Sequence, residues 1–265
     1  MHPVLQHILA RRGQSVPVND GRKITLVLYG GGMSGVAGAG AMIALQDLGF
    51  AHAFDAIYTY SAGFPNASYL LGDETRLGTS IYYEDLSRGQ FIKLWRFWRI
   101  MDVHHLTRVM ATTKFLPIDQ ILRASTELYV RLWRVGARRT EYVEAHQFPG
   151  EQYLRLMAAA TSLRHAGIGS IQLGDDRYED YPFSPDVPEH LSYALGTDAT
   201  DFLVIYNRPD QQPRGVRQDE RHYEIIPDIW VRNTCPNPNK LKRVVEAMAN
   251  QVYRLFGDPR ILTLI

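Results

Sequence analysis

The stretch ITLVLYGGGMSG, residues 24–35, decides how the rest of the chain is interpreted. Residues 24–29 are almost continuously apolar and rich in β-branched side chains, which is typical of a strand buried on both faces of a parallel sheet. Glycines follow at once, and apolar residues then recur at helical spacing, at Ala37, Ala41, Leu45 and Leu48. These residues therefore predict a strand, a glycine turn and a helix.

The next segment repeats the same order. Phe54 to Tyr60 is predicted to be a second buried strand, Ser61-Ala62-Gly63 its turn, and Phe64 to Leu71 the helix that leaves it. Successive strand–turn–helix units are typical of a parallel sheet with helices on its faces. Both turns would then lie at the carboxyl ends of neighbouring strands, where such sheets bind ligands.

The remaining patterns fit one α/β domain over residues 1–265. We expect a three-layer α/β/α arrangement with a mostly parallel central sheet. A short helix is expected within residues 1–22 and a mostly helical cap region at 75–125. Further predicted elements are a strand at 128–135, a helix at 153–161, a hairpin at 171–179, a strand at 202–206, an edge strand at 223–226 and a C-terminal helix at 240–256.

Bulk composition excludes some classes of protein. The formal net charge is +1, so nothing in it indicates a nucleic-acid partner. Cys235 is the single cysteine, which fits a reducing compartment and rules out an intrachain disulfide. Residues 1–20 have no signal-peptide pattern, and no window approaches the roughly 20 apolar residues of a membrane span. We expect a cytoplasmic protein, with any membrane contact at its surface.

The glycine loop permits three interpretations. Gly30, Gly31, Gly32 and Gly35 let the backbone approach a ligand closely, with N–H groups of the next helix aimed at an anion. An oxyanion hole needs such donors, a dinucleotide cradle needs them too, and a plain tight turn needs neither. The dinucleotide hypothesis also requires an acidic residue at the end of the second strand. Asp55 lies at its beginning, which disfavours a nucleotide.

The serine turn resembles a nucleophile elbow. Thr59-Tyr60-Ser61-Ala62-Gly63 is close to G-x-S-x-G, in which a sharp strand-to-helix turn presents the serine oxygen to a cleft. Ala62 and Gly63 are small enough for strand and helix to crowd together, whereas Thr59 replaces the first glycine. The alternative interpretation is a serine that merely caps the following helix.

In this order, the two motifs resemble the patatin-like phospholipase family. The family also has an aspartate in a D-G-G or D-G-A motif after a small-residue helix and a short hairpin. Here MAAATS at 157–162 and the predicted hairpin lead to Asp180. The likeness runs from about residue 24 to 210, and residues 116–119 and 141–143 resemble the bacterial cytoplasmic branch.

The resemblance implies a lipid acyl hydrolase with a Ser61–Asp180 dyad. Asp180 would act as general base, and backbone N–H groups of the 30–35 loop would hold the oxyanion. The substrates would be carboxylic esters of lipids, and neither a metal nor an organic cofactor is implied. No Cys/His/Asp cluster has metal spacing, and no histidine completes a triad.

Three departures from the family pattern leave a second hypothesis open. Thr59 replaces the elbow glycine, Tyr181-Pro182 replaces the glycines after the aspartate, and Ser34 stands where the family usually carries a basic residue. A stiff β-branched residue or a proline could displace the dyad. The alternative is therefore a catalytically weak pseudoenzyme that acts as a lipid-binding or regulatory protein.

One helical stretch has the composition of a membrane-surface helix. Between Phe91 and Met101 aromatic and apolar residues recur at helical spacing and are accompanied by Lys93, Arg96 and Arg99. The alternative is an ordinary cap over the core, with its tryptophans packed inward. A peripheral membrane contact through this segment is therefore one of two expectations.

Overall fold

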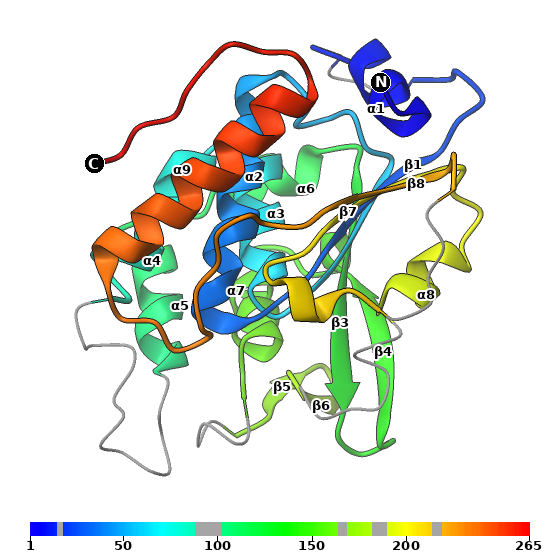
Figure 1. Ribbon diagram of the computed structural model, residues 1–265. Coiled ribbons are helices and arrows are strands. Elements are labelled where there is room, and N and C mark those ends of the chain that lie inside the picture. Colours follow the sequence, from blue (N-terminus) through cyan, green and yellow to red (C-terminus); the bar gives the residue numbers. More distant parts are fainter. Residues whose placement is uncertain (15–17, 88–101, 164–168, 182–189, 214–218) are drawn as a thin grey trace.

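The computed structural model describes residues 1–14, 18–87, 102–163, 169–181, 190–213 and 219–265. Its centre is an eight-stranded sheet in the order β5-β6-β3-β2-β1-β7-β8, with β4 paired to β3 (Figure 1). The parallel strands are β1 (Ile24–Leu28), β2 (Ala56–Tyr60), β3 (Glu127–Arg134), β7 (Asp201–Ile205) and β8 (His222–Ile225). The antiparallel strands are β4 (Arg139–Glu144), β5 (Ile171–Leu173) and β6 (Asp176–Glu179).

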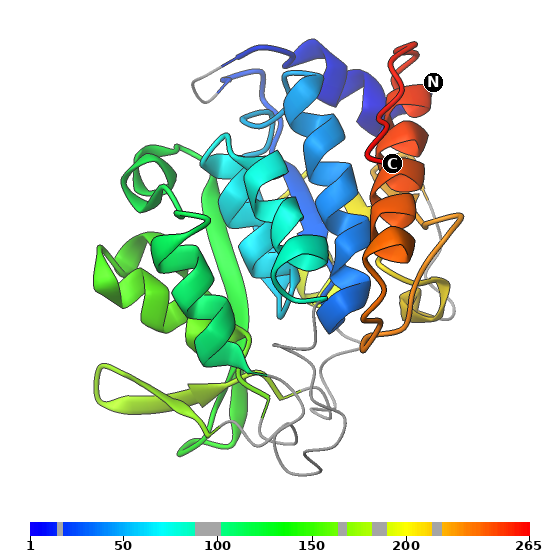
Figure 2. The same cartoon turned by 90° about the vertical axis from the view of Figure 1, so that its left-hand side faces the viewer.

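Helices cover the sheet on both faces. One layer contains α2 (Val36–Asp47), α3 (Gly63–Leu71), α4 (Thr75–Glu84), α5 (Val103–Thr112), α7 (Glu151–Ala160) and α9 (Pro238–Leu255). Figure 2 shows this layer face on, with α2 packed between α9 and α4. The opposite face carries α8 (His190–Leu195), while α1 (Pro3–Ala10) packs near β7 and β8, and α6 (Ile118–Arg123) contacts α3. The predicted α/β class with a mostly parallel sheet is confirmed.

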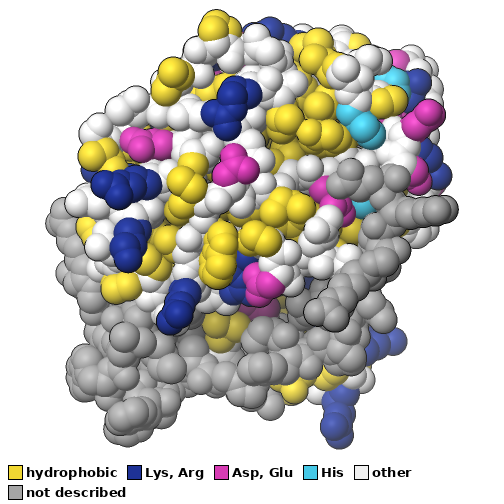
Figure 3. All heavy atoms as spheres, in the orientation of Figure 1, with side chains coloured by type: hydrophobic (Ala, Val, Ile, Leu, Met, Phe, Trp, Pro, Cys, Tyr) yellow, Lys and Arg dark blue, Asp and Glu magenta, His cyan; other side chains and the backbone are white. Residues whose placement is uncertain are grey.

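The hydrophobic core lies mainly between the sheet and the larger helical layer. All five residues of β1 are buried, as are all five of β7, because β1 and β7 are interior strands. On the α8 face a second cluster is rich in tyrosines, among them Tyr29, Tyr58, Tyr60 and Tyr206. Hydrophobic, basic and acidic side chains are interspersed on the face of the molecule that Figure 3 shows.

Most of the predicted elements are present, with ends shifted by a residue or two. β8 is an edge strand as expected, and the 75–125 segment contains α4, α5 and α6 within its described part. β4, which begins at Arg139 and pairs along β3, was not among the elements expected from the sequence. The segment from Phe91 to Met101 lies outside the described residues, and among those described no helix is long and apolar enough to cross a membrane.

Register brings the two motif-bearing turns together. Leu28 at the end of β1 is opposite Thr59 near the end of β2, and the strands run parallel. The glycine loop that follows β1 and the serine turn that follows β2 therefore emerge side by side at the same edge of the sheet. β7 ends at this edge too, because Ile205 is opposite Leu28 on the other side.

Candidate active site

Ser61 occupies a strained turn between β2 and α3. Its φ is 49°, in the left-handed region that non-glycine residues rarely adopt. Such backbone strain costs of the order of 1–3 kcal/mol and clusters at functional sites. A serine held this way between strand and helix has the backbone of a nucleophile elbow, a feature that the imperfect sequence motif alone leaves open.

Small residues around the turn are required by close backbone approach. A Cβ added to Gly30 would lie 2.6 Å from Ser61 Cβ, and one added to Gly35 would lie 2.6 Å from Ala62 Cβ. At Gly63 an added Cβ would lie 3.0 Å from the Leu28 carbonyl oxygen. The glycine loop, the serine turn and β1 thus crowd against one another, as the motif spacing predicts.

Thr59 is accommodated by the sheet and does not lie at these crowded contacts. Its side chain is fully buried, and its hydroxyl donates a hydrogen bond of 2.8 Å to the carbonyl oxygen of Tyr129 in β3. The extra methyl and hydroxyl groups therefore occupy space between neighbouring strands. Ser61 keeps its turn conformation despite the loss of the motif's first glycine.

The glycine loop has the positive φ values that its composition predicts. Gly31 has φ 138° and Gly32 has φ 57°, after which residues Gly32–Gly35 form a short 3-10 turn into α2. The N–H of Met33 donates to Asn233 O at 2.9 Å, and the N–H of Ser34 donates to Gly31 O at 3.1 Å. Within the described part of the chain, the N–H groups of Gly31 and Gly32 have no such acceptor.

Side chains from distant segments hold the loop in place. Asn207, just after β7, donates from Nδ2 to the carbonyl oxygens of Tyr29 and Gly30, and its Oδ1 accepts from the N–H of Gly38 at 2.7 Å. Gln211 Nε2 donates to the same Gly30 oxygen at 2.8 Å. Sequence reasoning missed this bracing, because it depends on which strand ends lie side by side in the sheet.

Ser34 is part of the same bracing. Its hydroxyl lies 2.9 Å from Gly31 O and 3.0 Å from Asn233 Oδ1, and Arg208 also donates to Asn233 Oδ1. Ser34 is fully buried. Ser34 therefore stabilises the loop from within the protein.

Asp180 lies directly after β6 and faces the serine turn. Its N–H donates to Ser162 O at 2.9 Å, and its carboxyl group lies near enough to Ser61 for the serine hydroxyl to lower its pKa. Only 2% of the residue is exposed, and this burial raises its pKa to about 6, against the opposing effects of the Ser61 hydroxyl and of Arg131. Its neighbour Asp175, by contrast, is exposed at the hairpin turn.

Arg131 brings a positive charge near the site that sequence reasoning did not single out. It lies in β3, is 1% exposed, and its guanidinium carbon is 6.0 Å from the centre of the Tyr60 ring. Its charge lowers the pKa of Asp180. The alternation of β3, with Leu128, Val130 and Leu132 on the opposite face, was the available signal.

Histidine does not complete a triad at the described site. His190 is buried on the α8 face, with Nδ1 2.7 Å from the Tyr142 hydroxyl and Nε2 3.2 Å from Leu28 O. Burial, followed by the charge of Arg131, lowers its pKa to about 3. A nucleotide site would also need an acidic residue beside the glycine loop. Asp55 lies instead where β1 and β2 begin, at the other end of these strands, and there it binds Arg11 and the N–H of Ile24.

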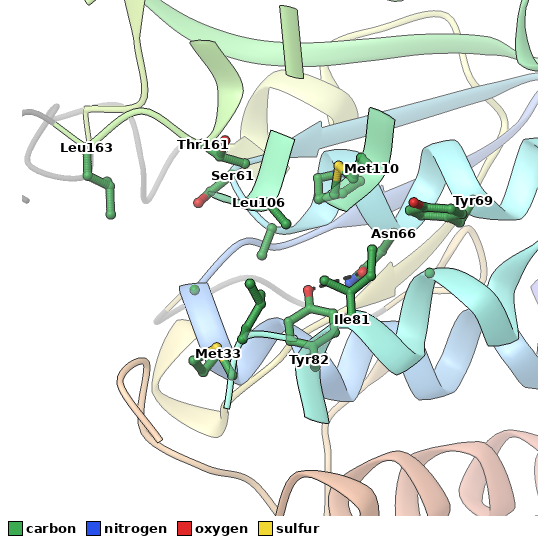
Figure 4. Close-up of a pocket in the computed structure, with 15 residues that line it drawn as sticks. Met33, Ser61, Asn66, Tyr69, Ile81, Tyr82, Leu106, Met110, Thr161 and Leu163 are labelled. Carbon is green, nitrogen blue, oxygen red and sulfur yellow. Dashed lines mark hydrogen bonds between the residues drawn. The ribbon is translucent and has the colours of Figure 1, made fainter. Parts of the chain in front are cut away.

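Ser61 opens into an apolar pocket between α3, α4 and α5. Figure 4 shows Ser61 beside Thr161, with Leu163 beyond them on one side and the labelled side chains of α4 and α5 on the other. Its apolar lining includes Met33, Pro65, Ile81, Leu86, Leu106 and Met110. The described part of the 75–125 segment thus forms much of the pocket wall.

Among the described residues there is no cluster of three or more His, Cys, Asp or Glu that could hold a metal.

Comparison with known proteins bears on the fold. No family model matches the chain, and no curated protein matches it by sequence. VipD from Legionella pneumophila superposes with a TM-score of 0.56 at 11% identity, over 91% of this chain and 67% of VipD. Two structures of ExoU, one of them a complex with SpcU from Pseudomonas aeruginosa, each give a TM-score of 0.43, at 14% and 13% identity. This chain spans 53% and 54% of the length of the two ExoU chains. Membership of the bacterial cytoplasmic branch stays a prediction. The likeness to VipD, together with the sheet described above, shows that the chain has a patatin-like α/β fold.

Proposed function

We propose that this chain is a lipid acyl hydrolase that uses Ser61 as nucleophile and Asp180 as general base. One observation carries the proposal: a serine in a strained turn lies beside a buried carboxylate and lines an apolar pocket. A solvated capping serine would need neither the positive φ nor the buried partner. The apolar lining favours the hydrocarbon part of an ester as the group bound there.

The proposed reaction has two steps. Asp180 accepts the Ser61 proton as the serine oxygen attacks the ester carbonyl, and it returns that proton to the departing alcohol. Water then attacks the acyl-Ser61 ester, again with Asp180 as base, which releases the carboxylic acid and restores the serine. A pKa of about 6 suits this role, because the carboxylate is ionised at neutral pH yet more basic than an ordinary aspartate.

Backbone donors for the oxyanion come from the glycine loop in this proposal. Gly32 lines the pocket together with Ser61, and the N–H groups of Gly31 and Gly32 have no acceptor within the described residues. The N–H groups of Met33 and Ser34 already have carbonyl partners. Of the glycines expected from sequence, Gly31 and Gly32 are therefore our proposed donors, whereas Gly30 and Gly35 serve close packing.

The second candidate is a lipid-binding protein with little turnover. It is favoured by the same loop geometry, because two N–H groups of the motif are engaged within the protein and cannot serve an oxyanion. Against it stands Thr59, whose hydrogen bond to Tyr129 keeps it clear of the serine. For either candidate we also propose that the protein works in the cytoplasm and meets lipid at a membrane surface.

An active-site probe separates the two candidates. A fluorophosphonate should label the wild-type protein at Ser61, located by mass spectrometry, and Ser61→Ala should abolish both labelling and hydrolysis of a short p-nitrophenyl ester. Ser68→Ala is the matched control, since this buried serine only bonds Phe64 O and the Tyr153 hydroxyl. Labelling that persists in Ser61→Ala would remove Ser61 as nucleophile, and an unlabelled wild type would favour the binding protein.

A further inference from the structure

We infer that the pocket beside Ser61 accepts a medium-length acyl chain and that Tyr69 forms its end wall. This inference rests on the proposed function, because it names the class of substrate that the site would take. The pocket is built along α3, the helix that begins directly after the serine turn. Its length is therefore set by the distance between the turn and the first bulky side chain across its path.

One face of α3 forms the floor of the pocket. Ala62, Pro65, Asn66 and Tyr69 recur every three or four residues, which places them on the same side of a helix, and all four line the pocket. Figure 4 shows Tyr69 at one end of the pocket and Ser61 well away from it, toward Leu163 at the other end. An acyl chain attached to the serine would therefore extend along α3 toward the tyrosine ring.

The spacing along α3 gives the length of chain that fits. Ala62 and Tyr69 are separated by seven residues, which is about 10 Å along a helix axis. In an extended polypeptide three backbone bonds advance about 3.6 Å, and an extended hydrocarbon chain advances by a similar amount per bond. An octanoyl chain therefore reaches roughly 9 Å and a palmitoyl chain roughly 18 Å. The pocket therefore matches an octanoyl group, and the far half of a straight palmitoyl chain would meet the wall.

Tyr69 is fixed firmly enough to act as a wall. It is 2% exposed, and its hydroxyl donates to the carbonyl oxygen of Lys114 at 2.5 Å. Its ring lies directly against α4, because a Cβ added to Gly78 would be 2.3 Å from the ring carbons. The ring is thus held between α4 and the segment after α5, and a longer substrate cannot push it aside without breaking these contacts.

The experiment compares hydrolysis of p-nitrophenyl octanoate and palmitate in the same detergent. Wild type should prefer octanoate, and Tyr69→Leu should raise the palmitate-to-octanoate ratio of kcat/KM by at least ~10-fold, as expected when a pocket gains or loses room for methylene groups. Tyr69→Phe keeps the ring and should keep the octanoate preference. Tyr153→Leu is the matched control, because this buried tyrosine stacks on Phe64 outside the pocket lining.

Binding to Ser61→Ala by calorimetry gives a second readout that needs no turnover. This variant should bind octanoate in preference to palmitate, and adding Tyr69→Leu should remove the preference. An unchanged ratio in Tyr69→Leu, or the same change in Tyr153→Leu, would overturn the end wall. If the wild type hydrolyses neither ester but shows this Tyr69-dependent binding, the hydrolase proposal fails and the chain-length inference stands.

Discussion

Replacing Asp180 with asparagine should stabilise the protein at neutral pH while removing its activity. The carboxylate is 2% exposed, and its pKa rises from 3.8 to about 6, mainly because burial disfavours the charged form. At about 1.36 kcal/mol per pKa unit, ionising this group in the folded protein costs about 3 kcal/mol relative to the unfolded chain. Asparagine keeps the shape without the charge, so up to this amount should be recovered.

The gain depends on pH in a defined direction. Because the folded state holds the proton more tightly than the unfolded state, the stability of the wild type falls as pH rises from about 4 to about 6, and the loss is complete above that range. Asp180→Asn has no such term. The two proteins should therefore have similar stability near pH 4, and the variant should unfold up to roughly 10 °C higher at pH 7.5.

Thermal and urea unfolding at several pH values measure the stability, and ester hydrolysis measures the activity. Turnover of Asp180→Asn should fall by at least ~100-fold if the carboxylate is the general base. Asp175→Asn, at an exposed position in the same hairpin, is the control and should change neither property. The reasoning is refuted if Asp180→Asn is less stable than wild type at pH 7.5, or if the difference in stability is the same at all pH values.

Three further predictions concern the same site. First, kcat/KM of the wild type should rise about tenfold per pH unit below about pH 6 and level off above, because Asp180 must lose its proton to act as base; a flat pH–rate profile across this range would contradict that role. Second, Gly30→Ala should destabilise the protein by about 1–3 kcal/mol and lower fluorophosphonate labelling, since its Cβ would lie 2.6 Å from Ser61 Cβ, whereas Gly136→Ala, with open space around it, should do neither; normal labelling of Gly30→Ala would show that the contact does not position the serine. Third, Thr59→Gly should lose the hydrogen bond to Tyr129 and strand propensity, about 1–3 kcal/mol in urea unfolding, without gaining labelling; a tenfold gain, about 1.4 kcal/mol of barrier, would mean that Thr59 misplaces Ser61.

Local patterns were sufficient for the interior of the sheet. The runs that became β1, β2 and β7 are apolar along most of their length, because both faces of an interior parallel strand are buried. β4 was missed because its side chains, RTEYVE, are exposed or half-buried and show no apolar alternation. Its strand conformation comes from backbone pairing with β3 in an antiparallel hairpin, which needs no apolar alternation in β4 itself.

Contacts between distant segments complete the site, and single motifs do not report them. Asn207 reaches Gly30 across 177 residues, and Asn233 reaches Ser34 across 199. Nothing in the local sequence of either asparagine distinguishes it from an ordinary loop residue. The role of Asn207 follows from the strand order, which brings the end of β7 beside the end of β1.

The sequence by itself determined where two backbone segments can pass close to each other, because it places glycines at 30–35 and small residues after Ser61. Those requirements are local, since they follow from a strand turning sharply into a helix. The chemistry of Asp180 was decided only by tertiary structure. In sequence it ends an acidic run typical of a solvated turn, but the fold buries it, pairs it with Ser61 and places Arg131 nearby, and this desolvation gives an ordinary aspartate a pKa of about 6.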